Sequence, residues 1–237
     1  MAGLPDERVR ADPIILAPGF PAEALLNYFG HARVAAAHAQ DPLLALGAML
    51  PDFASMLRER IADLGHARLR EGAALHHASD AAFHAAPEFV AQVALSSAWL
   101  RAHGVARGPA LAAAHVGIEL CIDVELARER GVAQLYTAAL AAAAEPEVER
   151  AIAWRTDAAG PRWRELRVRL RDRGAPDPNT RPALLARGVA RALEERPRLA
   201  LDAHARTQVE AWLAQTASVL RDLAAPLLAR VVCATRC

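Results

Sequence analysis

An all-α fold is predicted by three features of this sequence of 237 residues. Hydrophobic residues make up 54% of the chain, and among them Ala and Leu are far more frequent than Val and Ile. Ala and Leu lose little side-chain freedom in a helix, whereas β-branched residues lose more. Prolines and glycines divide the chain into segments of helical length, and none of these segments has the pattern of a convincing strand. We therefore expect a bundle of helices.

Proline marks where the helices of the N-terminal half begin and end. It is tolerated in the first turn of a helix, and Pro21, Pro42 and Pro87 each stand at such a position. In the interior of a helix it removes a hydrogen bond, so a break is expected at Pro51, with a helix or loop after it. The expected elements of this half are an irregular segment over 1–20, helices over 21–40 and 42–50, the helix or loop over 52–64, and helices over 66–84, 87–102 and 110–129.

The C-terminal half contains few candidate ligands but many arginines. Residues 132–157 are rich in alanine, and residues 161–173, PRWRELRVRLRDR, alternate arginine with apolar side chains. This alternation is typical of an amphipathic helix with a solvated face. Residues 174–182 form a turn-rich connection to two further helices, over 183–195 and 203–231.

The chain is therefore expected to have three parts. They are the irregular segment 1–20, a helical core over 21–130, and a C-terminal helical extension over 131–237 that packs on this core. The candidate ligands lie almost wholly in the core. We therefore expect the extension to serve as a scaffold, a lid or an interface.

Composition excludes several classes of function. The formal net charge is +1, which gives no general attraction to nucleic acid or to an anionic membrane. No signal peptide is recognisable, and no apolar run reaches the roughly 18 residues that a membrane span requires. Three cysteines in a chain of this length do not suggest a disulfide scaffold. We expect a cytoplasmic protein without nucleic-acid or membrane partners, for which a homodimer is left open.

The segment AALHHASDAAFHA, residues 73–85, carries three candidate metal ligands at a regular spacing. His76, Asp80 and His84 are each four residues apart. Each residue of an α-helix advances about 100°, so a step of four residues rotates a side chain by only about 40°. The three side chains therefore face roughly the same way, among apolar neighbours. Charged groups in such surroundings require partners or a metal ion.

The same spacing recurs in the segment AAAHVGIELCIDVEL, where His115, Glu119 and Asp123 are again four residues apart. Adjacent members of such a triple are about 6 Å apart along the helix axis, but the first and third are about 12 Å apart. Each triple therefore indicates either one ion with a substrate-facing group or a two-metal site. Histidine and carboxylate ligands without thiolate fit Mn, Fe or Zn.

Two further segments each offer a candidate ligand in apolar surroundings. His31 lies on the expected first helix, and Asp52 follows Pro51, where the expected break would turn the carboxylate toward a site. Three other residues are candidates for contacting a substrate. They are Arg33 and Arg107, because guanidinium binds phosphate in a bidentate manner, and His77, which is rotated by about 100° from its neighbour on the helix.

These segments together resemble the bacterial acyl carrier protein phosphodiesterases over residues 25–126. Residues 27–31, NYFGH, resemble the family's Asn-aromatic-x-x-His opening, and residues 47–52 resemble its Gly-x-x-x-x-Asp element. Residues 72–80 match its Gly-x-x-x-His-x-x-x-Asp motif, and Asp123 falls where a later helix of the family carries an aspartate.

The chain departs from the family pattern at three places. His84 stands where the family usually has an aspartate, and His77 with Ala78 replaces basic residues. The family's Asp-x-x-x-Asp-His is here Glu119-x-x-x-Asp123-Val124, with a histidine one turn earlier.

The resemblance implies an all-α, HD-like helical bundle, to which the sequence pattern adds the C-terminal helices. It also implies Mn-dependent hydrolysis of the phosphodiester that joins phosphopantetheine to acyl carrier protein, which is then the expected partner. We accordingly expect a metal-dependent phosphate-ester hydrolase, with one or two ions of Mn, Fe or Zn. The metal ligands preferred for it are His31, Asp52, His76, Asp80, Glu119 and Asp123. His84 and His115 are expected to act as ligands or as general acid and base.

Two other functions are left open by these residues. Mixed histidine and carboxylate ligands on several helices would also suit a di-iron oxygenase on an HD-like bundle. A non-catalytic helical interaction protein with a structural metal site would need the same ligands. Metal content, absorption under air and turnover of phosphate esters would distinguish the three.

Overall fold

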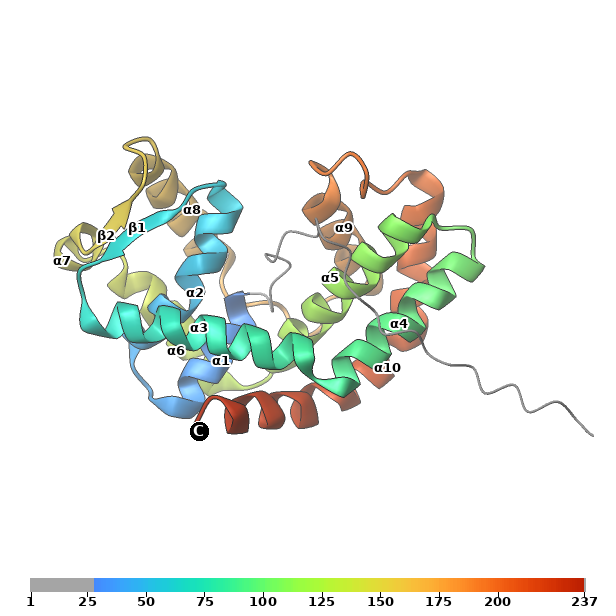
Figure 1. Ribbon diagram of the computed structural model, residues 1–237, viewed down its shortest axis with the longest axis horizontal. Coiled ribbons are helices and arrows are strands. Elements are labelled where there is room, and N and C mark those ends of the chain that lie inside the picture. The colour runs from blue at the N-terminus through green and yellow to red at the C-terminus, as the bar shows by residue number, and fades with distance from the viewer. Residues whose placement is uncertain (1–27, 237) are drawn as a thin grey trace, which may run out of the picture.

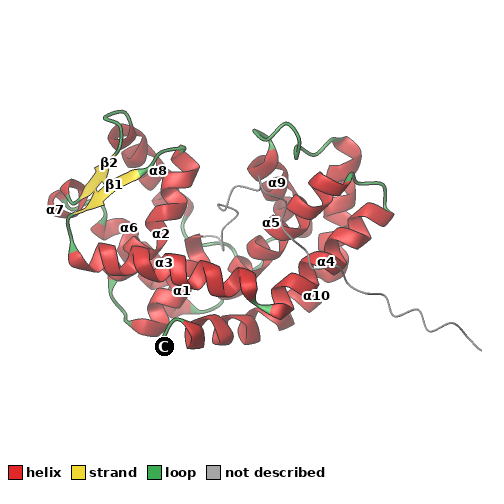
Figure 2. Cartoon of the chain, viewed as in Figure 1, coloured by secondary structure: helices red, strands yellow, loops and turns green. Residues whose placement is uncertain are grey.

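The computed structural model describes residues 28–236 and is predominantly helical (Figures 1 and 2). The described residues form ten helices and one two-stranded sheet, so the predicted all-α class is confirmed. The predicted irregular segment 1–20, the first residues of the predicted first helix and Cys237 lie outside the described residues.

In chain order the elements are α1 (Tyr28–His38), α2 (Pro42–Leu57), β1 (Ile61–Leu64), α3 (Ala67–Ala85), α4 (Pro87–Ala102), α5 (Arg107–Leu126), α6 (Arg130–Ala142), α7 (Pro146–Arg150), β2 (Ile152–Trp154), α8 (Ala159–Arg173), α9 (Pro182–Leu193) and α10 (Ala203–Ala234). The helices α3, α4, α8, α9 and α10 lie close to their predicted bounds. In α8 the apolar side chains Trp163, Leu166 and Leu170 are buried, as the amphipathic pattern predicts.

The break predicted at Pro51 is wrong, because α2 continues through this residue to Leu57. Asp41 caps the helix by accepting hydrogen bonds from the backbone N–H groups of Leu43 and Leu44. Eleven of the helix's residues are buried, six of them large apolar side chains. Burying one such side chain stabilises the folded state by about 1.5–3 kcal/mol. The six together therefore outweigh the roughly 3 kcal/mol that a proline inside a helix costs.

The expectation that the chain contains no strand is also wrong. β1 and β2 pair antiparallel, with Ile61 opposite Trp154 and Leu64 opposite Ile152. Strands of four and three residues are too short to show an alternating pattern, so the sequence gives no signal for them. The start of α5 differs as well, because Pro109 lies within its first turn instead of before it.

Two glycines allow α2 and α3 to pack with their backbones in contact. A Cβ atom added at Gly72 would lie 2.3 Å from the carbonyl oxygen of Leu44, and one added at Gly47 would lie 2.4 Å from that of Leu69. No side chain fits at either position. This close approach places the second half of α2, with Asp52, beside the middle of α3, with His76.

The last helix joins the two sides of the molecule. In Figure 1, α10 runs beneath the bundle from α4 and α9 to the end of α1. Gly117 of α5 gives it room, because a Cβ atom there would lie 2.5 Å from the ring of Trp212. The helices beyond residue 130 thus pack directly on α2, α3 and α5. Among the described helices, none is both long and apolar enough to cross a membrane.

The variant Gly72→Ala is expected to destabilise the protein, because its methyl group can be accommodated only if α2 and α3 move apart. Overpacking of this kind costs about 1–3 kcal/mol, measurable by chemical denaturation. Gly131→Ala is the matched control, since nothing lies within 4 Å of a Cβ atom at this helical position. An equal effect of the two substitutions would contradict the backbone contact.

Candidate metal centre

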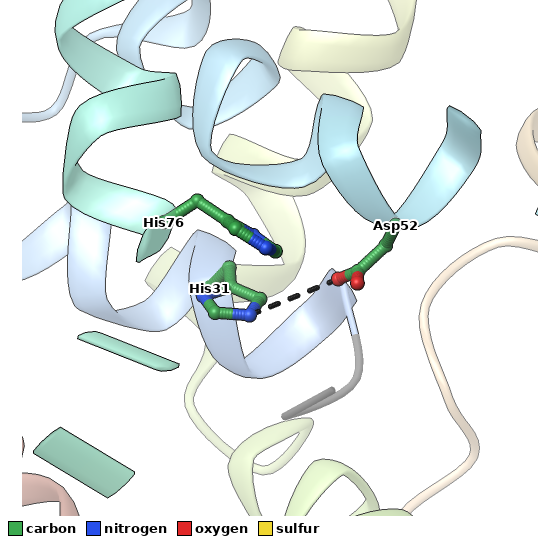
Figure 3. A group of neighbouring side chains, drawn as sticks. All are labelled: His31, Asp52 and His76. Carbon is green, nitrogen blue, oxygen red and sulfur yellow. Dashed lines mark ion pairs between the residues drawn. The ribbon is translucent and has the colours of Figure 1, made fainter. Parts of the chain in front are cut away.

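Three buried side chains from three helices converge in a first cluster. His31 of α1, Asp52 of α2 and His76 of α3 each offer one ligand atom, and these atoms lie within 4.8 Å of one another. Figure 3 shows the three side chains pointing toward one another, and the two imidazole rings have centroids 4.0 Å apart. We call this group the first cluster.

The tautomer of His76 is set by the backbone of α2. Its Nδ1 lies 2.9 Å from the carbonyl oxygen of Ala48, which can only accept a hydrogen bond. Nδ1 therefore carries the proton and Nε2 presents a lone pair. Burial lowers the pKa of His76 to about 4, so the ring is neutral near pH 7. A neutral imidazole held through one nitrogen is the usual form of a metal-ligating histidine.

The tautomer of His31 follows from Ser79, which lies between the two histidines. The Ser79 hydroxyl donates its hydrogen to the carbonyl oxygen of His76 at 3.0 Å. Its oxygen must therefore accept the second contact, a hydrogen bond of 2.9 Å from Nδ1 of His31. The lone pair on Nε2 of His31 then faces the carboxylate of Asp52, with the two atoms 3.8 Å apart.

Asp52 supplies the negative charge of the first cluster. Among the described residues, no group donates a hydrogen bond to either of its buried carboxylate oxygens. Burial raises the pKa of Asp52 well above its usual value, and the charges of Asp80, Glu119 and Asp123 raise it further. Imidazole lone pairs and a buried carboxylate that face one another repel unless a proton or a metal cation lies between them. The first cluster can therefore hold a metal ion.

A second cluster lies on α3 and α5. His84, His115 and Glu119 also offer ligand atoms within 4.8 Å of one another. Nε2 of His115 lies 3.0 Å from Oε1 of Glu119, and Nε2 of His84 lies 3.8 Å from the same oxygen. The two rings stack with centroids 4.8 Å apart, and Phe89 of α4 packs edge-on against both. We call this group the second cluster.

Asp80 and Asp123 connect the clusters electrostatically. Asp80 Oδ1 lies 3.1 Å from Nε2 of His84, and its charge also raises the pKa of Asp52 in the first cluster. Burial raises the pKa of Glu119, and Asp80 raises it further, although His115 and His84 oppose this. Asp123 is buried and acts on Asp52. The four carboxylates therefore form a single interacting set.

The predicted helical triples are divided between the two clusters. His76 belongs to the first and His84 to the second, in agreement with the 12 Å separation expected along a helix. The triple on α5 contributes His115 and Glu119 to the second cluster, whereas the charge of Asp123 acts on the first.

The residues proposed for substrate contact lie outside both clusters. His77 is exposed, with its ring edge-on to that of His76. Arg33 forms an ion pair with Glu129, with Nε and Oε2 2.7 Å apart. Arg107 is exposed at the first residue of α5, two turns before the histidine of that helix. Helix rotation explains the positions of His77 and Arg33, because neither a residue next to a ligand nor one two positions away shares the ligand's face.

Sequence reasoning missed two tyrosines beside the first cluster, the half-buried Tyr28 and the buried Tyr136. The rings of Tyr28 and Tyr136 stack with centroids 5.9 Å apart. Burial raises the pKa of Tyr28 to about 12, with a contribution from Asp123, whereas the charge of Arg173 lowers it. Tyr28 could have been found from its position three residues before His31, on the same helix face. Nothing in the sequence indicates Tyr136, Arg173 or the role of Ser79.

Comparisons with known proteins add no assignment. No family model, curated protein or solved structure matches this chain. The likeness to acyl carrier protein phosphodiesterases therefore rests on the short motifs alone.

Replacing Asp52 by asparagine is expected to stabilise the metal-free protein near pH 7. The pKa of Asp52 is raised in the folded state above the unfolded value of about 3.9, so the folded state binds this proton more tightly. The stability contributed by the proton is present at low pH and is lost as pH rises through the folded pKa. The gain from Asp52→Asn should therefore grow with pH, to about 1–3 kcal/mol.

Thermal denaturation in chelator between pH 5 and pH 8 measures this gain. The exposed carboxylate of Asp63 provides the control, because Asp63→Asn removes the same charge at the surface. A gain that is absent, or that is the same for both variants at every pH, would show that Asp52 is not an uncompensated buried charge.

Proposed function

We propose that this protein is a metal-dependent hydrolase of a phosphate ester, with a phosphodiester as the favoured substrate. The observation that carries the proposal is the orientation of His31 and His76. Hydrogen bonds to Ser79 and Ala48 occupy Nδ1 of each ring, so Nε2 is the unprotonated nitrogen of both, and Nε2 of His31 lies 3.8 Å from Asp52. Two imidazoles held in this way, next to a buried carboxylate, favour a divalent cation over a hydrogen-bonded core.

The chemistry of the ligands narrows the choice of metal. The first cluster has two nitrogen ligands and one carboxylate and no thiolate, a set that suits Mn, Fe or Zn. Manganese is favoured by the resemblance to acyl carrier protein phosphodiesterases. A divalent ion bound there would supply Lewis-acid chemistry, since such ions neutralise phosphoryl oxygens and lower the pKa of water toward 7.

The side of the centre that is open to solvent indicates where substrate enters. The side chains of Asp80 and His84 are 18% and 21% exposed, whereas His31 is fully buried and Asp52 is 5% exposed. A phosphate ester therefore approaches from the face of α3 that carries Asp80 and His84. With an ion only at the first cluster, His84 would be the group on this face that protonates the leaving alkoxide.

Acyl carrier protein is the proposed macromolecular substrate. This part of the proposal rests on the motif resemblance, which includes Gly72, His76 and Asp80. The backbone contact at Gly72 and the hydrogen bond of His76 give two of these motif residues a structural purpose in this chain.

Hydrolysis of bis(p-nitrophenyl) phosphate in the presence of Mn²⁺ tests the reaction. The wild-type protein is expected to turn the ester over, and chelator should abolish the activity. Asp52→Asn and His76→Asn should each lower kcat/KM more than about 100-fold, because loss of a ligand exceeds the 10–100-fold effect of losing a ligand's supporting partner. His103→Asn, a change at an exposed histidine of another helix end, should leave the rate unchanged.

The same preparation distinguishes the other two functions. Iron-dependent absorption that changes on exposure to air, without ester hydrolysis, would favour a di-iron oxygenase. Bound metal with no turnover, and unfolding on chelation, would favour an interaction protein. Release of phosphopantetheine from holo-acyl carrier protein would assign the substrate, and its absence with an active small ester would exclude this carrier.

A further inference from the structure

We propose that His84, His115 and Glu119 hold a second divalent cation, with Asp80 placed between the two ions. The proposal deepens the proposed function, and it rests on the first cluster of that function being a metal site. The proposal of a second ion does not depend on which reaction the centre catalyses. The expected consequence is a centre that binds two ions per chain.

The distances within the second cluster suit a shared ion. Two ligand atoms that are each about 2.1 Å from one metal lie about 3.0 Å apart at a right angle and about 3.4 Å apart in a tetrahedron. Oε1 of Glu119 lies 3.0 Å from Nε2 of His115 and 3.8 Å from Nε2 of His84. Nε2 of His84 lies 3.1 Å from Oδ1 of Asp80. Small movements of these side chains would bring all the ligand atoms onto one ion.

The ligands of the two clusters are too far apart to share one ion. Each cluster has a carboxylate of its own, Asp52 in the first and Glu119 in the second, with Asp80 beside His84. Among the described residues, no arginine forms an ion pair with these three carboxylates. His76 and His84 are about 12 Å apart along α3, so an ion at the first cluster cannot also bind the ligands of the second.

The two histidine rings of the second cluster are held side by side. The rings of His84 and His115 stack with centroids 4.8 Å apart, and Phe89 packs edge-on against both. Both Nε2 atoms lie near Oε1 of Glu119, where one divalent ion can bind them together.

The number of bound ions tests the proposal directly. Metal-free protein is loaded with Mn²⁺, desalted and analysed for manganese per chain, and the electron paramagnetic resonance spectrum is recorded. Wild type is expected to bind two ions and to give the signal of a spin-coupled pair. Glu119→Gln and His115→Asn should weaken the second ion at least about 100-fold, which leaves one ion with a six-line mononuclear signal.

Two further variants complete the design. Asp52→Asn should also leave one ion, but at the second cluster, and His103→Asn should keep both. One ion in wild type, or two ions in both Glu119→Gln and His115→Asn, overturns the second site. If these variants do not fold, as judged by circular dichroism, the stoichiometry and spectrum of the wild type decide alone.

Failure of the second site and failure of the hydrolase are distinguishable. Two bound ions without ester hydrolysis would support the second site and contradict the reaction. Hydrolysis with a single bound ion would support the reaction and overturn the second site. A protein that binds no manganese, zinc or iron would overturn both.

Discussion

The centre depends on one contact, the hydrogen bond that His76 donates from Nδ1 to the carbonyl oxygen of Ala48. This bond can form because Gly47 and Gly72 let the backbones of α2 and α3 touch. It fixes the ring of His76, and the carbonyl group of the same residue orients Ser79, which in turn orients His31. One helix contact therefore sets the direction of two imidazole nitrogens. Asp52 is carried to them by the same packing.

Small side chains allow this close packing of helices, and the close packing in turn removes hydration from the carboxylates. Gly47, Ala48 and Gly72 lie where α2 and α3 touch, so the backbones of these two helices lie close together. In such surroundings each ionised carboxylate loses most of its hydration, and the raised pKa values of Asp52 and Glu119 express this. The ring of Trp212 of α10 packs against α5 at Gly117. The C-terminal helices thus contribute to the centre without supplying a ligand.

The sequence predicts the helices and the types of ligand better than it predicts how the ligands are divided between the two clusters. The spacing of His76, Asp80 and His84 correctly places them on one side of α3, because that follows from the 3.6-residue turn alone. Which of the three lies beside His31 depends on how the helices cross, and the spacing of residues along one helix does not predict the crossing. The path of α2 through Pro51 depends on burial on all its sides. The pairing of β1 with β2 joins residues about 90 positions apart, which local pattern cannot reveal.

The position of His84 links the charge of the centre to the substrate proposed for it. A carboxylate here, as in the resembling family, would add a fifth acidic side chain to the four already present. An imidazole instead places Nε2 at 3.1 Å from Oδ1 of Asp80 and 3.8 Å from Oε1 of Glu119, as a nitrogen ligand that adds no negative charge. An anionic phosphodiester would therefore meet less repulsion than it would from a fifth carboxylate. The histidine at position 84 thus suits both the second ion and the anionic substrate proposed for this centre.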